Sequence, residues 1–305
     1  MKAPDICKLV GRDKKHLVQL CLPIEKLKGK LTFPVVASEK LDGVFCLAYI
    51  EGMSVYIYSR TGEEYTSLKH LKDELWKLSK ETQFDVFIFE AYSSYVDQPT
   101  ISGWCRDTKN QHTSVEAYIH DGMTLEEFKT GDNELCYLDR IEYIHKIFYD
   151  NQAFYRNVNI IQFFNCRSYE SLMAYADQIW ADGGEGVVAR QPFCNYQPGK
   201  RNHTMVKVKK GVSFDLQVVA LEEGKGKYVG KVGKLVCKDA KGTVVKVGSG
   251  LSDQERSWWW TEFGYRDILN KIVQIDAMAI SSKGVLREPR YKGIREDKKE
   301  VDTIE

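Results

Sequence analysis

The feature that most constrains the fold is a change in the pattern of apolar residues and glycines after Gly211. Beyond this glycine, short β-branched segments are separated by glycine turns, which is typical of small β-barrels. The segments expected as strands are 212–222, 231–238, 242–248 and 272–281. One helix interrupts them, because Ser252 and Glu255 form a capping box. About 95 residues with this pattern predict a small closed barrel such as an OB-fold. We therefore expect a separate domain over 211–305.

Before Gly211, strands and helices are mixed. Segments expected as strands are 33–38, 44–50, 53–59, 84–91, 114–120, 186–190 and 205–209. Helices are expected at 65–80, after Thr124, at 138–149 and at 168–181. Glu51-Gly52 is expected as a hairpin turn. The predicted fold class is α+β, with antiparallel sheets and helices in a domain over 1–210.

The charges are unevenly distributed although the net charge is +1. Residues 205–305 carry 20 Lys and Arg against 15 Asp and Glu, whereas 1–204 carry 24 against 28. A basic C-terminal third favours a polyanionic partner, although a solvated lysine-rich surface explains the same count. The 43% hydrophobic and 29% charged content excludes a disordered or collagen-like chain.

Cysteine usage and the absence of apolar runs predict a cytoplasmic protein that does not enter a membrane. The eight cysteines are spread singly, and no C-x-x-C pair occurs. No apolar run approaches the ~18 residues of a membrane span, and no secretory signal is visible. The six histidines are scattered, so we expect no zinc site.

Five short segments carry residues suited to phosphate chemistry: Lys40-Leu41-Asp42-Gly43, Ser59-Arg60-Thr61-Gly62, Phe89-Glu90, Glu185-Gly186-Val187-Val188 and Lys207-Val208-Lys209. They supply one candidate nucleophile, three carboxylates and three further cations. A lysine becomes nucleophilic when nearby cations lower its pKa. A triphosphate needs Lys, Arg and Mg²⁺ to neutralise its charge. The set therefore favours covalent nucleotidyl transfer. The glycine-rich segment 224–231 fits neither a P-loop nor G-x-G-x-x-G, and we interpret it as a flexible basic hairpin.

The order of these motifs resembles that of the nucleotidyltransferase family of ATP-dependent DNA ligases, RNA ligases and mRNA capping enzymes. The resemblance continues after Gly211. The segment 247–252 (V-G-S-G-L-S) resembles a turn in the OB domain of DNA ligases, and 287–298 (R-E-P-R-Y-K-G-I-R-E-D-K) resembles their C-terminal motif. The match covers roughly 33–298. The length is similar to that of the small ligases of phages, large DNA viruses and some bacteria.

The resemblance implies a nucleotide site. Lys40 would take AMP as a phosphoramidate, Ser38 would contact the adenine edge, and Arg60 would bind near the ribose or the DNA 5′-phosphate. Glu90 would hold the ribose hydroxyls or a metal, and Glu185 would bind the catalytic metal.

The resemblance also assigns phosphate contacts. Lys207 and Lys209 would contact the α-phosphate, since alternate residues of one strand face the same side. Arg295 and Lys298 would orient the pyrophosphate. Asp42 would act on either the metal or the nick terminus.

Two positions depart from the family pattern. Phe45 stands where the motif K-x-D-G-x-R has an arginine associated with the nick. His120 stands where an aromatic residue stacks on adenine, although a histidine within a sheet explains it equally well. Trp258, Trp259 and Trp260 are expected mostly in the core, with stacking on a base as the alternative.

The implied function is that of an ATP-dependent DNA ligase that seals nicks in duplex DNA during replication, repair or recombination. ATP and Mg²⁺ or Mn²⁺ are the expected cofactors, and a monomer is expected. The hairpin lysines Lys225, Lys227 and Lys231 are expected to bind DNA phosphates, because a ten-residue connection is too short for a long encircling latch. An mRNA guanylyltransferase and a non-catalytic nucleic-acid-binding OB module are the alternatives.

Overall fold

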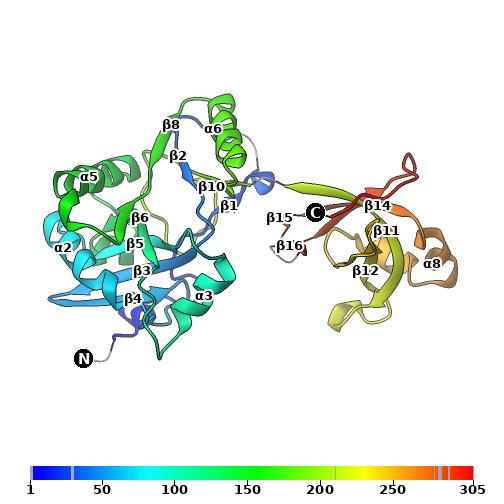
Figure 1. The fold of residues 1–305 in the computed structure, drawn as a ribbon, viewed down its shortest axis with the longest axis horizontal. Helices are drawn as coiled ribbons and strands as arrows, with labels where there is room; N and C mark the ends of the chain where they lie inside the picture. The colour runs from blue at the N-terminus through cyan, green and yellow to red at the C-terminus, as the bar shows by residue number, and fades with distance from the viewer. Residues whose placement is uncertain are drawn as a thin grey trace. The chain divides into compact units, whose positions relative to one another are not determined.

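The chain forms two compact units in the computed structural model, Met1–Val208 and Lys209–Glu305 (Figure 1). The structure describes residues 3–28, 31–209, 211–277, 279–280, 284–287 and 289–304. Within this part of the chain, no helix is long and apolar enough to span a membrane. The sequence places the boundary near Gly211, whereas the structural units divide just before Lys209.

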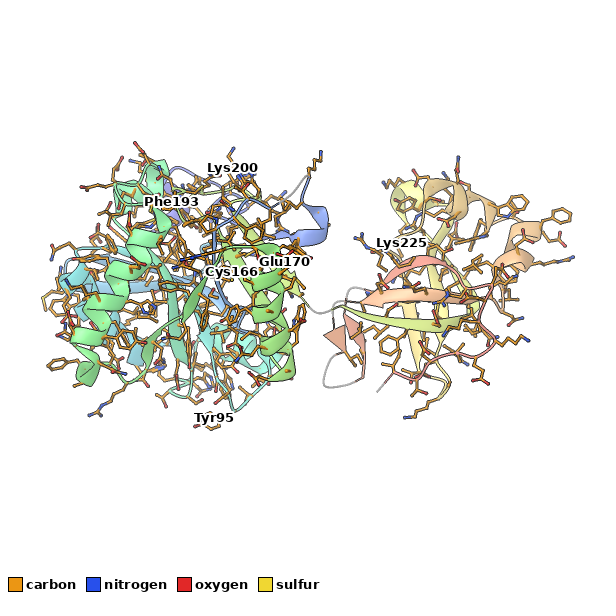
Figure 2. All side chains as sticks on the ribbon, turned by 90° about the horizontal axis from the view of Figure 1, so that it is seen from above. Tyr95, Cys166, Glu170, Phe193, Lys200 and Lys225 are labelled. Carbon is orange, nitrogen blue, oxygen red and sulfur yellow. The ribbon has the colours of Figure 1, made fainter. Side chains whose placement is uncertain are left out.

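A five-stranded sheet, here called sheet A, carries several motif segments of the first unit. Its order is β1 (Leu22–Pro23), β10 (Met205–Lys209), β9 (Gly186–Arg190), β2 (Val35–Glu39) and β8 (Phe163–Cys166). Helix α6 (Tyr169–Ala181) packs on one face, where Leu172 and Ala176 join the core of this sheet. Cys166 and Glu170 mark the junction of β8 and α6 in Figure 2. On the other face of β2, Val36 packs into the apolar cluster of the second sheet.

The second sheet of this unit, sheet B, has the strand order β4, β3, β5, β6, β7. Its strands are β4 (Ser54–Ser59), β3 (Val44–Glu51), β5 (Val86–Tyr92), β6 (Glu116–Met123) and β7 (Val158–Ile160). The β3–β4 turn consists of Gly52 and Met53, since Glu51 already pairs with Ser54. Gly52 has a φ of +62°, which a glycine adopts without strain. The turn is therefore one residue later than expected.

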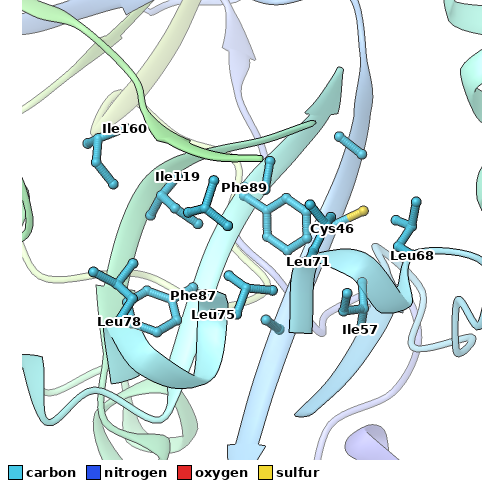
Figure 3. Packing of buried hydrophobic residues seen from close by; sticks show 14 of the residues in the cluster. Cys46, Ile57, Leu68, Leu71, Leu75, Leu78, Phe87, Phe89, Ile119 and Ile160 are labelled. Atoms are coloured by element: carbon cyan, nitrogen blue, oxygen red, sulfur yellow. The ribbon is translucent and has the colours of Figure 1, made fainter. Parts of the chain in front are cut away.

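Two helices cover one face of sheet B. They are α2 (Lys72–Thr82) and α5 (Tyr137–Asp150), and their apolar side chains share one buried cluster with Phe87 and Phe89. Figure 3 shows Leu75 and Leu78 of α2 in this cluster. Helix α2 begins later than the expected residue 65, because Tyr65 still donates its N–H to Ile57 and a 3₁₀ turn (Lys69–Leu71) intervenes. The opposite face packs on the N-terminal segment with α1 (Ile6–Leu9) and on α4 (Leu125–Thr130).

The expected α+β class is confirmed, but the sheets are not purely antiparallel. β1 pairs with β10 and β6 pairs with β7 in parallel. A parallel neighbour needs a long connection, and α4 and α5 provide it between β6 and β7. The strands β1, β7 and β8 were not predicted, because strands of two to four residues leave little periodicity. Helix α3 (Gln98–Arg106) was not predicted either.

In its described residues, the second unit contains a five-stranded sheet, a two-stranded ribbon and two α-helices. The strand order is β13 (Val244–Val247), β12 (Val232–Lys238), β11 (Val212–Glu223), β14 (Ile272–Ala277) and β17 (Arg290–Ile294). The helices α7 (Asp253–Trp258) and α8 (Glu262–Ile268) lie between β13 and β14 in the chain. The predicted closed barrel is corrected: between the ends of this sheet, only an isolated bridge from Ser249 to Arg290 is found in the described residues. The result is the partly open barrel of an OB-fold.

Two further expectations for this unit are corrected. The strand expected over 272–281 ends at Ala277, while residues 278 and 281 lie outside the described residues, as does Glu288 of the C-terminal motif. A short ribbon of β15 (Ala279–Ile280) and β16 (Leu286–Arg287) follows. Only Trp259 is buried, at 5% exposure, whereas Trp258 is 50% and Trp260 39% exposed. Helix α7 ends at Trp258, so the three tryptophans do not lie on one continuous helix.

Candidate nucleotide and metal site

Lys40 lies immediately after β2 and is held by the neighbouring strand β9. Its backbone N–H donates to the Gly186 carbonyl over 2.8 Å. Its Nζ forms an ion pair with the Glu185 carboxylate, and both side chains are mostly enclosed, at 22% and 14% exposure. The pairing of β2 with β9 brings the K-x-D-G and E-G-V-V motifs together, although 145 residues separate Lys40 from Glu185.

Glu90 lies on β5 of sheet B and belongs to the same charge cluster. Burial raises its pKa to about 8, the nearby Lys40 cation opposes that shift, and the Glu185 and Asp42 carboxylates add to it. Gly43 is required here, because a Cβ at this position would lie 2.7 Å from Glu90 Cγ and 2.4 Å from the Ala91 carbonyl oxygen. The glycine of K-x-D-G therefore allows the lysine segment to approach Glu90.

His120 occupies an irregularity in the pairing of β5 with β6. Ile88 pairs with Asp121 and Phe89 pairs with Ile119, so His120 is the extra residue of a β-bulge. Bulges near sites redirect a side chain. The imidazole lies 6.4 Å from the Phe45 ring, with an angle of 58° between the planes. The two positions that depart from the family pattern are therefore neighbours.

Arg190 is a site residue that the sequence analysis did not single out. Its Nη2 donates to His120 Nδ1 over 3.1 Å and so joins sheet A to sheet B. Since a guanidinium can only donate, Nδ1 must be unprotonated. Burial, together with the Arg190 charge, holds the pKa of His120 well below its usual range. Arg190 also approaches Ser38 Oγ at 3.5 Å, and its guanidinium lies 5.1 Å from the centre of the Tyr137 ring.

An arginine at the end of an apolar strand is the signal by which Arg190 could have been found. It follows G-V-V-A, and its side chain is buried at 8% exposure. No carboxylate of the described residues forms an ion pair with it. Cys21 is a second unpredicted neighbour: burial raises the pKa of its thiol, while Arg190, Lys40 and Lys207 oppose that shift.

Lys207 and Lys209 alternate along β10 with the buried Val206 and Val208. The two lysines therefore share a face, as the sequence predicts. Lys207 pairs in register with Pro23 of β1, close to Cys21. Arg60 is exposed at the end of β4, where Ser59 Oγ accepts the backbone N–H of Thr61.

Arg295 and Lys298 belong to the second unit and share one buried carboxylate. Arg295 Nη1 donates to both oxygens of Asp215 over 3.0 and 3.1 Å, and Lys298 Nζ lies 3.3 Å from Asp215 Oδ2. Arg295 also forms an ion pair with Asp297 at 2.7 Å. Asp215 was not identified from the sequence, because it is a single acid within a strand.

Family models match both units of the chain. The model of the ATP dependent DNA ligase domain matches residues 15–209, and that of the DNA ligase OB-like domain matches 223–295. The chain belongs to the ATP-dependent DNA ligase family.

Three similar proteins illustrate the extent of the likeness. The DNA ligase of Nitrosopumilus maritimus is 26% identical over 261 residues, covering 76% of this chain and 42% of that protein. The solved structure Pmar-Lig_PreS3 has a TM-score of 0.80 at 24% identity, covering 91% of this chain and 67% of that one. A Lig E DNA ligase structure has a TM-score of 0.70 at 16% identity, covering 91% and 98%. The chain spans less than half the length of its first curated relatives.

Members of this family use ATP and a divalent metal, and the acidic residues of this chain fit a magnesium ion. No preformed cluster of three or more metal-binding side chains occurs among the described residues. Magnesium is usually held by one or two carboxylates together with substrate phosphates. Glu90 and Glu185 lie within electrostatic range of each other and offer the oxygen ligands that this ion prefers.

The basic hairpin predicted over 224–231 is confirmed as a turn between β11 and β12. Gly224 donates its N–H to the Lys231 carbonyl over 2.9 Å, and a 3₁₀ turn (Gly226–Tyr228) fills the loop. The buried Arg256 supports its base by donating to the Val232 and Gly248 carbonyls over 2.7 and 2.6 Å. Lys225 and Lys227 remain exposed.

Proposed function

We propose that this chain is an ATP-dependent DNA ligase that seals nicks in duplex DNA as a monomer, with Lys40 as the nucleotide carrier. The observation that carries the proposal is the ion pair of Lys40 with Glu185, next to the ends of β2 and β9 in sheet A, with Glu90 of sheet B in the same charge cluster.

The reaction begins when Lys40 Nζ attacks the α-phosphorus of ATP. A P–N bond forms, the bond to the pyrophosphate oxygen breaks, and pyrophosphate leaves. Lys40 must first lose a proton, and a divalent ion bound through Glu90 and Glu185 would supply positive charge that favours this loss and neutralises the phosphates. Lys207 and Lys209 are proposed to contact the α-phosphate, and Arg295 and Lys298 are proposed to orient the leaving pyrophosphate.

The next two steps act on DNA. An oxygen of the 5′-phosphate at the nick attacks the AMP phosphorus, which breaks the P–N bond and frees Lys40. The 3′-hydroxyl then attacks the activated 5′-phosphorus, and AMP leaves as the phosphodiester forms. Each step depends on positioning and charge stabilisation rather than on new covalent groups.

The test is transfer of label from α-³²P-ATP and Mg²⁺ to the protein, followed by addition of nicked DNA. We expect an acid-labile adduct that disappears as sealed DNA appears. Lys40→Arg should abolish the adduct, whereas Lys109→Ala, at an exposed loop lysine, should not. Labelling in the Lys40→Arg variant, or preferential labelling by α-³²P-GTP, would refute the proposal.

A further inference from the structure

A buried arginine joins the two sheets of the first unit beside the candidate site. Arg190 is the last residue of β9 in sheet A, and its Nη2 donates to Nδ1 of His120 on β6 of sheet B over 3.1 Å. Its Nη1 lies 3.5 Å from Ser38 Oγ, and its guanidinium lies 5.1 Å from the centre of the Tyr137 ring. Contacts with β2, β6 and α5 therefore fix the direction in which Arg190 donates.

The orientation of the His120 ring depends on this contact. His120 is the extra residue of a β-bulge, so no residue of β5 pairs with it directly. The torsion that turns a histidine ring has broad minima, so the side chain by itself selects no single ring plane. Within the described residues, Arg190 is the only hydrogen-bond partner of this imidazole, and it therefore selects the orientation.

The same contact determines the protonation of the imidazole. Because Nδ1 accepts from the guanidinium, the neutral ring must carry its proton on Nε2. Burial, together with the Arg190 charge, holds the pKa of His120 well below its usual range. The nitrogen that would take up a second proton is already occupied. The ring is therefore kept as a neutral flat surface and is not available as an acid or base at Nδ1.

Arg190 lies within electrostatic range of the candidate nucleotide site. Burial raises the pKa of Glu90, and the Lys40 and Arg190 cations oppose this shift. Ser38, which Arg190 approaches, lies on β2 two residues before Lys40 and is 2% exposed. The contact between Arg190 and His120 is thus close to the residue proposed to carry the nucleotide.

We infer that Arg190 is a positioning residue that holds the His120 ring neutral and in one plane, ready to stack on the base of ATP. The inference rests on the proposed function, since it takes ATP as the ligand and His120 as the ring beside its base. Stacking of a base on an aromatic ring depends on the relative orientation of the two planes. Without Arg190, the ring would have to be ordered when the nucleotide binds, which lowers the affinity.

The test uses Arg190→Met, which removes the donors but keeps a long side chain. Single-turnover labelling by α-³²P-ATP gives the KM for ATP and the rate at saturation. Binding of α,β-methylene-ATP, which cannot transfer AMP, gives a Kd without catalysis. We expect KM and Kd to rise roughly tenfold, while the saturating rate changes less than about threefold. Arg106→Met, at an exposed position of α3, is the matched control and should change none of these values.

A second background distinguishes positioning from a structural role. His120→Phe keeps a ring that needs no proton or hydrogen bond, so adding Arg190→Met there should change KM less than about twofold. Histidine ¹⁵N NMR provides a direct signature, with the His120 signal identified by its loss in His120→Phe. The unmodified protein should show the neutral ring protonated on Nε2, and Arg190→Met should show a mixture of tautomers. A thermal melt of each variant verifies folding.

The outcomes separate the inference from the proposed function. If the unmodified protein is neither labelled by ATP nor binds the analogue, the proposed function fails, while the NMR comparison still tests whether Arg190 holds the imidazole. Unchanged KM and Kd in folded Arg190→Met would overturn the inference alone. An equal loss in the His120→Phe background, or a ring protonated on Nδ1 in the unmodified protein, would also overturn it.

Discussion

The ion pair between Asp121 and Arg140 provides a prediction whose size follows from the structure. Arg140 Nε and Nη2 donate to the two oxygens of Asp121 over 2.8 and 2.9 Å, and Nη1 donates to the Leu135 carbonyl over 2.8 Å. The Arg140 side chain is 1% exposed and that of Asp121 6%. Asp121 directly follows the bulged His120, so this pair joins β6, at the site, to helix α5.

The perturbation is Asp121→Asn, which preserves the volume of the side chain but removes its charge. The Arg140 cation then stays buried without a counter-charge, and breaking such a pair costs about 3–5 kcal/mol. For a unit of this size, each kcal/mol lowers the melting temperature by about 2–4 °C. We therefore expect the first unit to melt roughly 10 °C lower. The loss of about 3–5 kcal/mol is a large part of a total free energy of unfolding of about 5–15 kcal/mol.

Differential scanning calorimetry is the assay, with the transition of the second unit as an internal reference. Asp177→Asn makes the same chemical change at an exposed position of α6 and should shift the free energy of unfolding by no more than about 0.5 kcal/mol. The double variant Asp121→Leu/Arg140→Met replaces the pair by apolar side chains and should recover most of the loss. A shift below about 2 °C for Asp121→Asn, or a double variant as unstable as the single one, would refute the reasoning.

Three further predictions concern the site and DNA. Because burial raises the pKa of Glu90 to about 8, its protonated form stabilises the fold below the unfolded pKa, and this contribution is lost as pH rises towards 8. Without divalent ions, the free energy of unfolding of Glu90→Gln relative to that of the unmodified protein should therefore rise from pH 5 to pH 8, by at most about 1.4 kcal/mol per pH unit. Urea unfolding at several pH values measures this difference, and a difference that does not change with pH would contradict the prediction. Arg295→Ala and Lys298→Ala should impair transfer of AMP from ATP to Lys40 far more than sealing of a nick already carrying 5′-AMP; equal damage in both assays argues against a role at pyrophosphate. Lys225→Ala/Lys227→Ala should weaken nick binding for all sequences and reduce the salt slope by up to about two units, while adenylation is nearly unchanged; an unchanged salt slope would exclude phosphate contacts by this hairpin.

The sequence by itself determined the local features and the family. The capping box of Ser252 with Glu255 forms as predicted, since its hydrogen bonds join residues three positions apart, and the helix expected after Thr124 begins with the same motif. The alternation that puts Lys207 and Lys209 on one face follows from strand geometry alone. The order of the motifs indicated the ligase family without any spatial information. Such features depend only on neighbours in the chain, which the sequence displays directly.

Only the tertiary structure decided which distant residues meet. Arg190 reaches His120 across 70 positions and Ser38 across 152, and no local pattern encodes either contact. The bulge that directs His120 towards Phe45 depends on the register between two strands, which is set by packing on both faces of the sheet. Asp215 forms ion pairs with both Arg295 and Lys298, because the pairing of strands remote in sequence brings these side chains together. The energies of these contacts arise from burial and partner geometry, and both exist only once the chain has folded.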